Sequence, residues 1–240
     1  MMGKQYIFET KRTRLRRYFR NFLLLILSLA MLYTVLCISI ISVARYESDL
    51  AKENFYKRAP DLVAIFTGDS GRIPFGLKKS LEYQTPEILI TGVYSSNSIR
   101  TLLLSQNPEL LQFMNIYANQ IEIDYLARNT VENVLSTLRF LRKNTSYYHT
   151  VLVISSDYHI LRIKLILQFI QASNDSFDFY FMSPETDYFQ WKNIKAISRE
   201  VVKTLKTLGF LLLWESEYPI KDDIETETAL AAPTSTPATP

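Results

Sequence analysis

Two serines, a histidine and an arginine lie close together in the second half of the chain. Ser155 and Ser156 end an apolar run, and His159 and Arg162 follow three residues apart, which places them on one face of a helix beginning here. A histidine near a hydroxyl group can transfer a proton to or from it, and an arginine can neutralise a developing charge. The pattern therefore predicts a catalytic or ligand-binding group. The alternative is a structural histidine at a helix start.

A second group follows an earlier apolar run. Gly68, Asp69 and Arg72 lie in a loop of small residues leading into a helix, which Pro74 can begin. Amide groups at a helix amino terminus favour an anion, and an arginine can grip phosphate or carboxylate. The Gly-Lys-Ser/Thr ending of a Walker loop is absent. The alternative is an ordinary strand-to-helix turn with an exposed arginine, and Asp69 either fills an acidic role or repels an anion.

A third group begins another helical pattern. Asn129 and Glu132 are spaced as in a capping box, in which each side chain bonds an amide group of the first turn, and capping alone would explain both. Capping does not explain Thr130 and Asn133, which lie in the same turn. These two residues therefore favour a ligand site at this position.

Short apolar runs alternate with helical patterns through the domain. Residues 62–67, 87–91, 151–155 and 177–182 predict strands buried on both faces, with 120–124 as a weaker candidate. Helical spacing follows Asn129 and Ser156, and the last long helix is expected over roughly Trp191 to Leu213. This alternation predicts an α/β fold with a mostly parallel sheet. Ligands bind beyond the carboxyl ends of such strands, where all three groups and Gly92 lie.

The amino-terminal part of the chain predicts a membrane anchor. Residues 21–43 contain no Asp, Glu, Lys, Arg or His, and as a helix they are about 35 Å long, enough to cross a bilayer. We therefore expect one transmembrane helix over residues 21–44. Residues 1–20 carry seven Lys and Arg residues against one Glu, so this segment is expected in the cytoplasm and the domain on the opposite face. The alternatives are a cleaved signal peptide ending near Ala44 and a buried core helix.

Composition limits the partners and the chemistry. The net charge is +3 and residues 1–20 contribute +6 (seven minus one), so the rest of the chain carries −3 (three minus six) and gives no indication of nucleic acid binding. Cys37 is the only cysteine and there are two histidines, so we expect no disulfide framework and no metal site. The cofactor is unknown.

The chain divides into five segments by composition. After the basic segment and the transmembrane helix, the charged residues 45–60 predict a tether. Residues 61–214 are long enough for one domain. Residues 215–240 begin acidic and end rich in Pro and Thr, which predicts a disordered tail.

Four segments of this domain, taken in order, resemble the YdcF/SanA/ElyC-type domain. They are Thr67–Ile73 and Ile90–Val93 after the first two strands, Ala127–Asn133 before a helix, and Ser156–Arg162 after a later strand. The resemblance covers residues 61–214. It implies a bacterial, Rossmann-like three-layer α/β domain, often preceded by one or two amino-terminal membrane segments. Together with the single span and its basic flank, we expect a single-pass anchor in the cytoplasmic (inner) membrane and the domain in the periplasm. The sequence departs from the usual pattern at Gly68–Asp69, where the family commonly has two glycines.

The resemblance implies a process rather than a reaction. The family is linked to cell-envelope integrity and peptidoglycan precursor metabolism, and its biochemical reaction is largely undefined. It implies that Asn129, Thr130, His159 and Arg162 form one catalytic site. The residues expected to bind a phosphorylated, nucleotide-like or lipid-linked molecule are Gly68, Asp69, Arg72, Gly92, Asn133, Ser155 and Ser156.

Three functions compete on the sequence alone. In an enzyme, His159 would transfer a proton, Arg72 and Arg162 would bind anionic oxygens, and Asn129 and Thr130 would orient the substrate. The rival is a non-catalytic envelope scaffold or sensor, because no strong set of nucleophile, base and acid is present. A cytoplasmic methyltransferase or nucleotide binder conflicts with the predicted topology.

Overall fold

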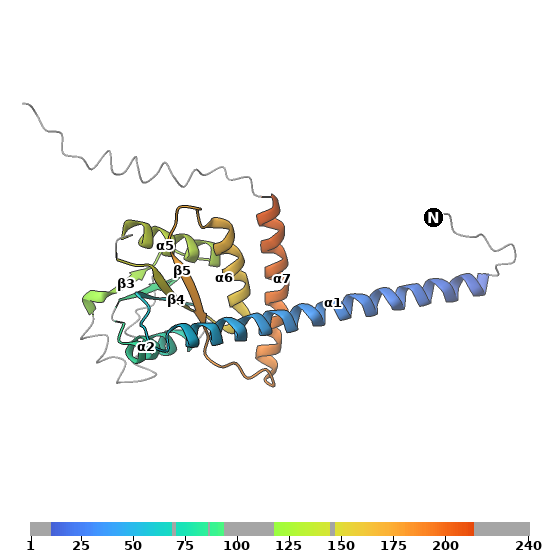
Figure 1. The fold of residues 1–240 in the computed structure, drawn as a ribbon. Coiled ribbons are helices and arrows are strands. Elements are labelled where there is room, and N and C mark those ends of the chain that lie inside the picture. Colours follow the sequence, from blue (N-terminus) through green and yellow to red (C-terminus); the bar gives the residue numbers. More distant parts are fainter. Residues whose placement is uncertain (1–10, 69–70, 86, 94–117, 145–146, 214–240) are drawn as a thin grey trace, which may run out of the picture.

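A five-stranded parallel sheet forms the centre of the domain in the computed structural model, which describes residues 11–68, 71–85, 87–93, 118–144 and 147–213 (Figure 1). Every pair of neighbouring strands is parallel, and the spatial order is β3-β2-β1-β4-β5. The strands are β1 (Leu62–Phe66), β2 (Ile88–Thr91), β3 (Ile121–Asp124), β4 (Thr150–Ile154) and β5 (Asp178–Met182). The predicted α/β class is confirmed, and the weak candidate at 120–124 is an edge strand.

Helices cover both faces of the sheet and make three layers. Helix α2 (Arg72–Tyr83) and the end of α1 (Lys11–Asn54) lie on one face, and α5 (Thr130–Lys143) and α6 (Asp157–Ile170) lie on the other. Strand β1 is buried at all five positions because its side chains alternate between these two layers. A short 3₁₀ turn, η1 (Ala118–Gln120), precedes β3, and α7 (Trp191–Leu213) packs outside against α6 and α1.

The strand order creates a crevice beyond the carboxyl ends of two central strands. From β1 the chain runs outward through β2 and β3, and it then returns to the other side of β1 to form β4 and β5. The order therefore reverses between β1 and β4, and parallel sheets bind ligands at such a point. This is the edge at which the sequence places the serine, histidine and glycine groups.

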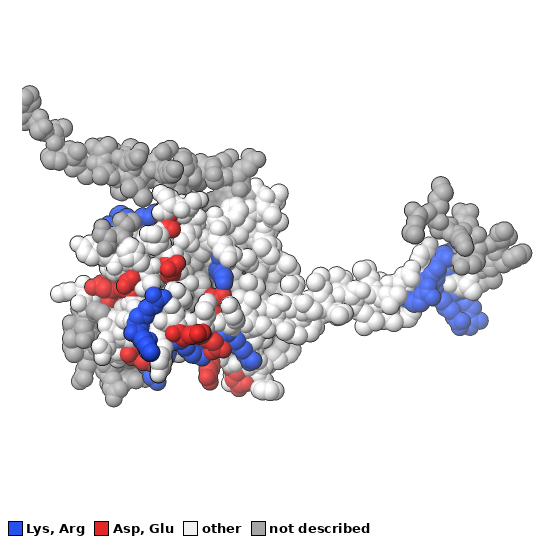
Figure 2. Space-filling view, viewed as in Figure 1, with Lys and Arg blue, Asp and Glu red and all other residues white. Residues whose placement is uncertain are grey.

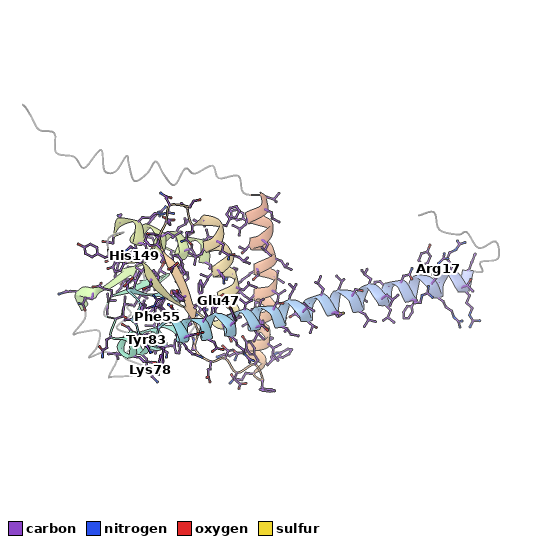
Figure 3. All side chains as sticks on the ribbon, in the orientation of Figure 1. Arg17, Glu47, Phe55, Lys78, Tyr83 and His149 are labelled. Atoms are coloured by element: carbon purple, nitrogen blue, oxygen red, sulfur yellow. The ribbon has the colours of Figure 1, made fainter. Side chains whose placement is uncertain are left out.

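Helix α1 extends far beyond the domain. Figure 2 shows basic side chains at the start of α1, then an uncharged part, and then the mixed charges of the domain. The uncharged part corresponds to residues 21–43 and is called the shaft of α1 below. Among the described residues, α1 is the helix that is long and apolar enough to cross a membrane. Only 6% of its most apolar segment is buried in the protein, so that segment is not a core helix. Figure 3 shows its side chains projecting into open space on all sides.

Much of the predicted tether is helical and packed against the domain. Residues 45–54 continue α1 without a break, and Glu47 is buried in an ion pair with Lys164 of α6. Beyond the helix, Phe55 packs against the rings of Tyr83 and Tyr180, with centroids 5.7 and 5.0 Å apart (Figure 3). The charged composition suggested a flexible segment, but one face of this stretch is buried. The predicted tail at 215–240 and residues 1–10 lie outside the described residues.

Gly76 allows α2 to approach the sheet closely. A Cβ atom there would lie 2.5 Å from Cδ1 and 2.7 Å from Cγ1 of the buried Ile65. We expect Gly76→Ala to lower the free energy of unfolding by about 1–3 kcal/mol, measured by urea unfolding of the full chain in detergent.

Gly209 in α7 is the matched control, because nothing lies within 4 Å of a Cβ atom added there. Gly209→Ala should raise stability by about 0.5–1 kcal/mol through helix propensity. Equal effects of the two substitutions would contradict the close approach at Gly76.

Candidate functional site

A cavity of about 340 Å³ opens at the carboxyl ends of β1 and β4. Nine of the predicted site residues line it, namely Gly68, Arg72, Gly92, Asn129, Thr130, Asn133, Ser155, His159 and Arg162. Ser156 is buried beside it, and Asp69 lies outside the described residues. The structure therefore brings the three sequence groups together around one space.

His159 and Arg162 share a partner that the sequence did not suggest. Glu200 of α7 is 1% exposed, and its Oε1 atom accepts from Arg162 Nε and lies 3.0 Å from His159 Nδ1. Arg162 Nη1 also donates to the Thr130 hydroxyl at 2.7 Å. One buried carboxylate thus holds the histidine and the arginine, and the arginine connects α6 to the first turn of α5.

The pKa of His159 lies below its ordinary value, so the imidazole is uncharged at neutral pH. Burial lowers the pKa of His159, the Arg72 and Arg162 charges lower it further, and Glu200 opposes them without reversing the shift. Arg162 Nη2 lies 2.8 Å from Nδ1, and a guanidinium only donates, so Nδ1 either accepts from Arg162 or donates to Glu200. In both tautomers Nε2 has no hydrogen-bond partner among the described residues, so it is the nitrogen available to a ligand.

Glu200 remains ionised despite its burial. Burial raises the pKa of this carboxyl, but the hydrogen bond from His159 and the positive charge of Arg162 outweigh it, and the net pKa lies below its ordinary value. The site therefore contains a fixed negative charge that orients a neutral imidazole.

Arg72 ties two strand ends together. Its guanidinium donates to the backbone oxygens of Phe66 and Thr67 at 3.1 and 2.9 Å and to the Ser156 hydroxyl at 2.9 Å. The side chain is buried rather than exposed as in the ordinary-turn alternative. These bonds fix the end of β1 against the start of α6, and Arg72 also contributes positive charge to the cavity.

Gly92 keeps two polar side chains close to the backbone. Its φ of +80° favours glycine, and a Cβ atom would lie 2.8 Å from Asn133 Oδ1 and 3.0 Å from Thr67 Oγ1. The Thr67 hydroxyl donates to the backbone oxygen of Thr91 at 3.0 Å, which holds the ends of β1 and β2 together. Gly92 therefore has a structural role at the cavity wall.

Asn129 caps α5, as the alternative interpretation predicted. Its Oδ1 atom accepts from the Glu132 amide at 3.0 Å, and the Glu132 carboxylate folds back onto the Asn129 side chain and the Arg128 amide. This differs from the standard capping box only in the amide that Glu132 reaches. Asn129 lines the cavity, but capping occupies its side-chain oxygen.

Ser155 is buried without a partner. The residue lines the cavity and is 1% exposed, and its buried Oγ atom has no hydrogen bond to any described residue. A buried hydroxyl normally finds a partner, because leaving it unsatisfied costs about 1–3 kcal/mol. Ser155 is therefore the position where a ligand oxygen would best complete the site.

The cavity is strongly positive. Its described lining includes Arg72, Arg128, Arg162 and Lys203 and no acidic side chain, although Glu200 lies just behind Arg162 and Lys203.

Three residues at the site were not predicted from the sequence. Arg128 is one of them, although it adjoins the capping motif. Glu200 and Lys203 were not predicted either. Their signal was faint, because Glu200 is the single acidic residue of α7 and lies on its buried face.

Within the described ranges, no group of three or more His, Cys, Asp or Glu side chains is arranged to hold a metal ion.

The chain matches none of the protein-family models compared with it, and a search of the curated proteins found no significant relative. The resemblance to the YdcF/SanA/ElyC-type domain therefore remains a prediction from the sequence.

Removing the Glu200 charge should destabilise the domain and release His159. We expect Glu200→Gln to lower the free energy of unfolding by about 3 kcal/mol, because Arg162 would lose the carboxylate that neutralises it in a buried place. Urea unfolding of the full chain in detergent measures the change.

The control is Glu82→Gln, which breaks the surface pair between Glu82 and Lys79. This exposed pair should contribute less than about 1 kcal/mol. A Glu200→Gln protein as stable as the Glu82→Gln protein would contradict the buried cluster.

Proposed function

We propose that this chain is a membrane-anchored protein of bacterial envelope biogenesis, of the YdcF/SanA/ElyC type, which binds a phosphorylated ligand in the cavity at the ends of β1 and β4. The ligand is a lipid-linked or nucleotide-like intermediate of peptidoglycan or lipid-carrier metabolism. The observation that carries the proposal is the positive cavity with a buried, unpaired Ser155 hydroxyl in its wall.

A phosphate group suits the charges and donors of this wall. Arg162, Arg128 and Lys203 supply positive charge, and charge-assisted hydrogen bonds are the strong ones in such sites. Residues at the amino-terminal ends of α2, α5 and α6 also line the cavity, and helix amino termini favour anions. The Ser155 hydroxyl can donate to a phosphate oxygen, which would satisfy it.

His159 supplies the chemistry in this proposal. Its imidazole is neutral because its pKa is lowered by burial and by the neighbouring arginines, so it can accept a proton near neutral pH. Glu200 fixes the ring and stabilises the imidazolium that forms. With Nδ1 donating to Glu200, Nε2 takes a proton from a water molecule, and this water attacks the terminal phosphorus of the ligand. The bond from that phosphorus to the bridging oxygen breaks, inorganic phosphate is released, and the leaving oxygen takes the proton from the imidazolium, while Arg162 neutralises the charge that develops.

A membrane location brings the domain to a lipid-linked ligand. The apolar shaft of α1 is exposed, and basic residues precede it, which supports a cytoplasmic amino terminus and a periplasmic domain. Ala44, the last residue of the possible signal-peptidase motif, is helical and 1% exposed in the core. A retained anchor therefore fits the packing better than cleavage does.

A binding module without chemistry is the second candidate. One observation favours it: Arg162, Glu200 and Thr130 bond to one another, so much of the polar wall is already satisfied. Such a module would use the cavity to sense or organise an envelope intermediate without changing it.

Removing either outer cation should weaken ligand binding. We expect Lys203→Gln and Arg128→Gln each to weaken binding of farnesyl diphosphate about tenfold, because each removes a bond to a charged group of about 1.5 kcal/mol. Titration calorimetry on the full chain in detergent measures this, and Lys78→Gln on the exposed side of α2 is the control. Unchanged affinity in both site variants would sink the proposed ligand class.

His159→Gln separates the two candidates. In an enzyme, this variant keeps farnesyl diphosphate affinity and loses phosphate release. In a binding module, neither the native chain nor the variant releases phosphate.

The proposed topology is tested by a reporter fused after Pro240. Alkaline phosphatase, which is active only outside the cytoplasm, should be active at this position, and a cytoplasm-dependent fluorescent protein should be dark. Replacing Arg12, Arg14, Arg16, Arg17 and Arg20 by Glu should reduce phosphatase activity. The opposite pair of signals would place the domain in the cytoplasm and revive a cytoplasmic nucleotide binder.

A further inference from the structure

Helix α7 lies against the membrane-crossing part of α1. Ile197 and Val201 of α7 are buried together with Ile40 of α1. Seven residues earlier in the apolar run, the Tyr33 hydroxyl donates to Ser198 at 2.6 Å. All of these α1 positions fall within the uncharged stretch that is long enough to span a bilayer, so α7 is held at the level of that stretch.

The position of these contacts along α1 gives their depth. Arg20 is the last charged residue before the span, and a hydrocarbon core of about 30 Å starting there ends near Ile40. Tyr33 lies about 10 Å before Ile40 at about 1.5 Å per residue. Figure 1 shows α7 running across α1 rather than along it. With α1 crossing the membrane, α7 lies close to the membrane plane, at the outer boundary of the hydrocarbon.

The side of α7 that faces along the shaft of α1 is apolar and exposed. Trp191 is 67% exposed, Leu205 is 50% exposed and Leu212 is 86% exposed. The stripe recurs every three or four residues and includes Ser198, which touches Tyr33. Its apolar members are Trp191, Ile194, Val202, Leu205 and Leu212. The described protein leaves this stripe uncovered, on the side where the bilayer would be.

A basic stripe runs beside the apolar one. Lys192, Lys195, Arg199, Lys203 and Lys206 recur at the same helical spacing, each one position after a member of the apolar stripe. The single acidic residue of α7, Glu200, is buried in the site cluster and does not face outward. Each basic side chain near an anionic lipid surface contributes about 1 kcal/mol of attraction. The exposed charge of α7 therefore complements anionic headgroups.

We propose that α7 is an interfacial helix, with its apolar stripe in the outer leaflet and its basic stripe among the headgroups of anionic phospholipids. This inference rests on the membrane anchoring in the proposed function. Amphipathic helices of this kind place their apolar face about 5–10 Å into the boundary region, which matches the depth of the Tyr33 and Ile40 contacts. Trp191 suits the same zone, because its ring prefers the interface.

The consequence for the site comes from Lys203. This lysine belongs to the basic stripe and also lines the cavity, and its neighbour Glu200 holds His159. The cavity therefore opens at headgroup level. A phosphorylated lipid can reach it while its chains stay in the bilayer.

Spin labels in bilayer discs of mixed anionic and zwitterionic phospholipid test this placement. In a full chain carrying Cys37→Ala, single labels are placed through Leu205→Cys on the apolar stripe, Leu27→Cys in the middle of α1, and Glu82→Cys on the far side of α2. Accessibility to oxygen and to a water-soluble nickel chelate is measured for each. We expect the label at 205 to resemble that at 27, with an oxygen-to-nickel ratio several-fold above that at 82.

Three results would overturn the inference. In the first, the label at 205 is as accessible to the nickel chelate as the label at 82, while the label at 27 is shielded. The anchor then crosses the membrane, but α7 lies in water. A label at 205 shielded from both reagents means that protein, such as a second copy, covers the stripe. A label at 27 open to nickel means that the anchor of the proposed function has failed as well.

The role of the basic stripe is tested separately by lipid charge. Replacing the anionic lipid with zwitterionic lipid should lower the oxygen-to-nickel ratio at 205 and leave that at 27 unchanged. The triple variant Lys192→Gln, Lys195→Gln and Lys206→Gln should reproduce this loss in anionic discs. An insensitive label at 205 would remove the proposed role of anionic headgroups.

Discussion

Helix α1 is the constraint on which the rest of the arrangement depends. It contains no glycine or proline from Lys11 to Asn54, so nothing along it provides the usual cause of a kink. Its first part is apolar and exposed, while its last turns are built into the α/β core through Ala44, Ala51 and the Glu47–Lys164 pair. In the proposed membrane anchoring, a helix buried at one end and suited to lipid at the other would fix the orientation of the sheet against the bilayer. A domain on a flexible tether would have no such preferred face.

Helix α7 carries this constraint to the cavity. One of its faces contacts α1 through Ile197 and Ser198, and the next turn delivers Glu200 to His159 and Arg162. The position of α7 along α1 and the geometry of the site are therefore not independent. A shift of α7 relative to α1 would move the carboxylate that holds the imidazole. The positive wall, the histidine and the contact between α7 and α1 therefore depend on one another.

The fold could be predicted because each element carries its own signal. Strands buried on both faces are wholly apolar, and the long helices repeat every three to four residues. The strand-end residues were found for a related reason, since parallel strands bring distant loops to one edge. Glu200 lies outside such a loop, so only the folded chain shows that it reaches His159. The helical end of α1 was missed because the charged composition of 45–54 masked one buried face, at Glu47 and Ala51.

The chemistry of the cluster explains why so polar a group is buried. A buried ion pair contributes little net stability, because desolvation offsets most of the attraction, so folding alone does not require Glu200 and Arg162. The pair does fix the ring of His159 and keep its Nε2 atom without a partner among the described residues. The unsatisfied Ser155 hydroxyl has a further cost that the domain does not recover internally. An anionic ligand that accepted from the cations and from the hydroxyl would offset these costs, so the cavity has the features of a binding site rather than of a packing defect.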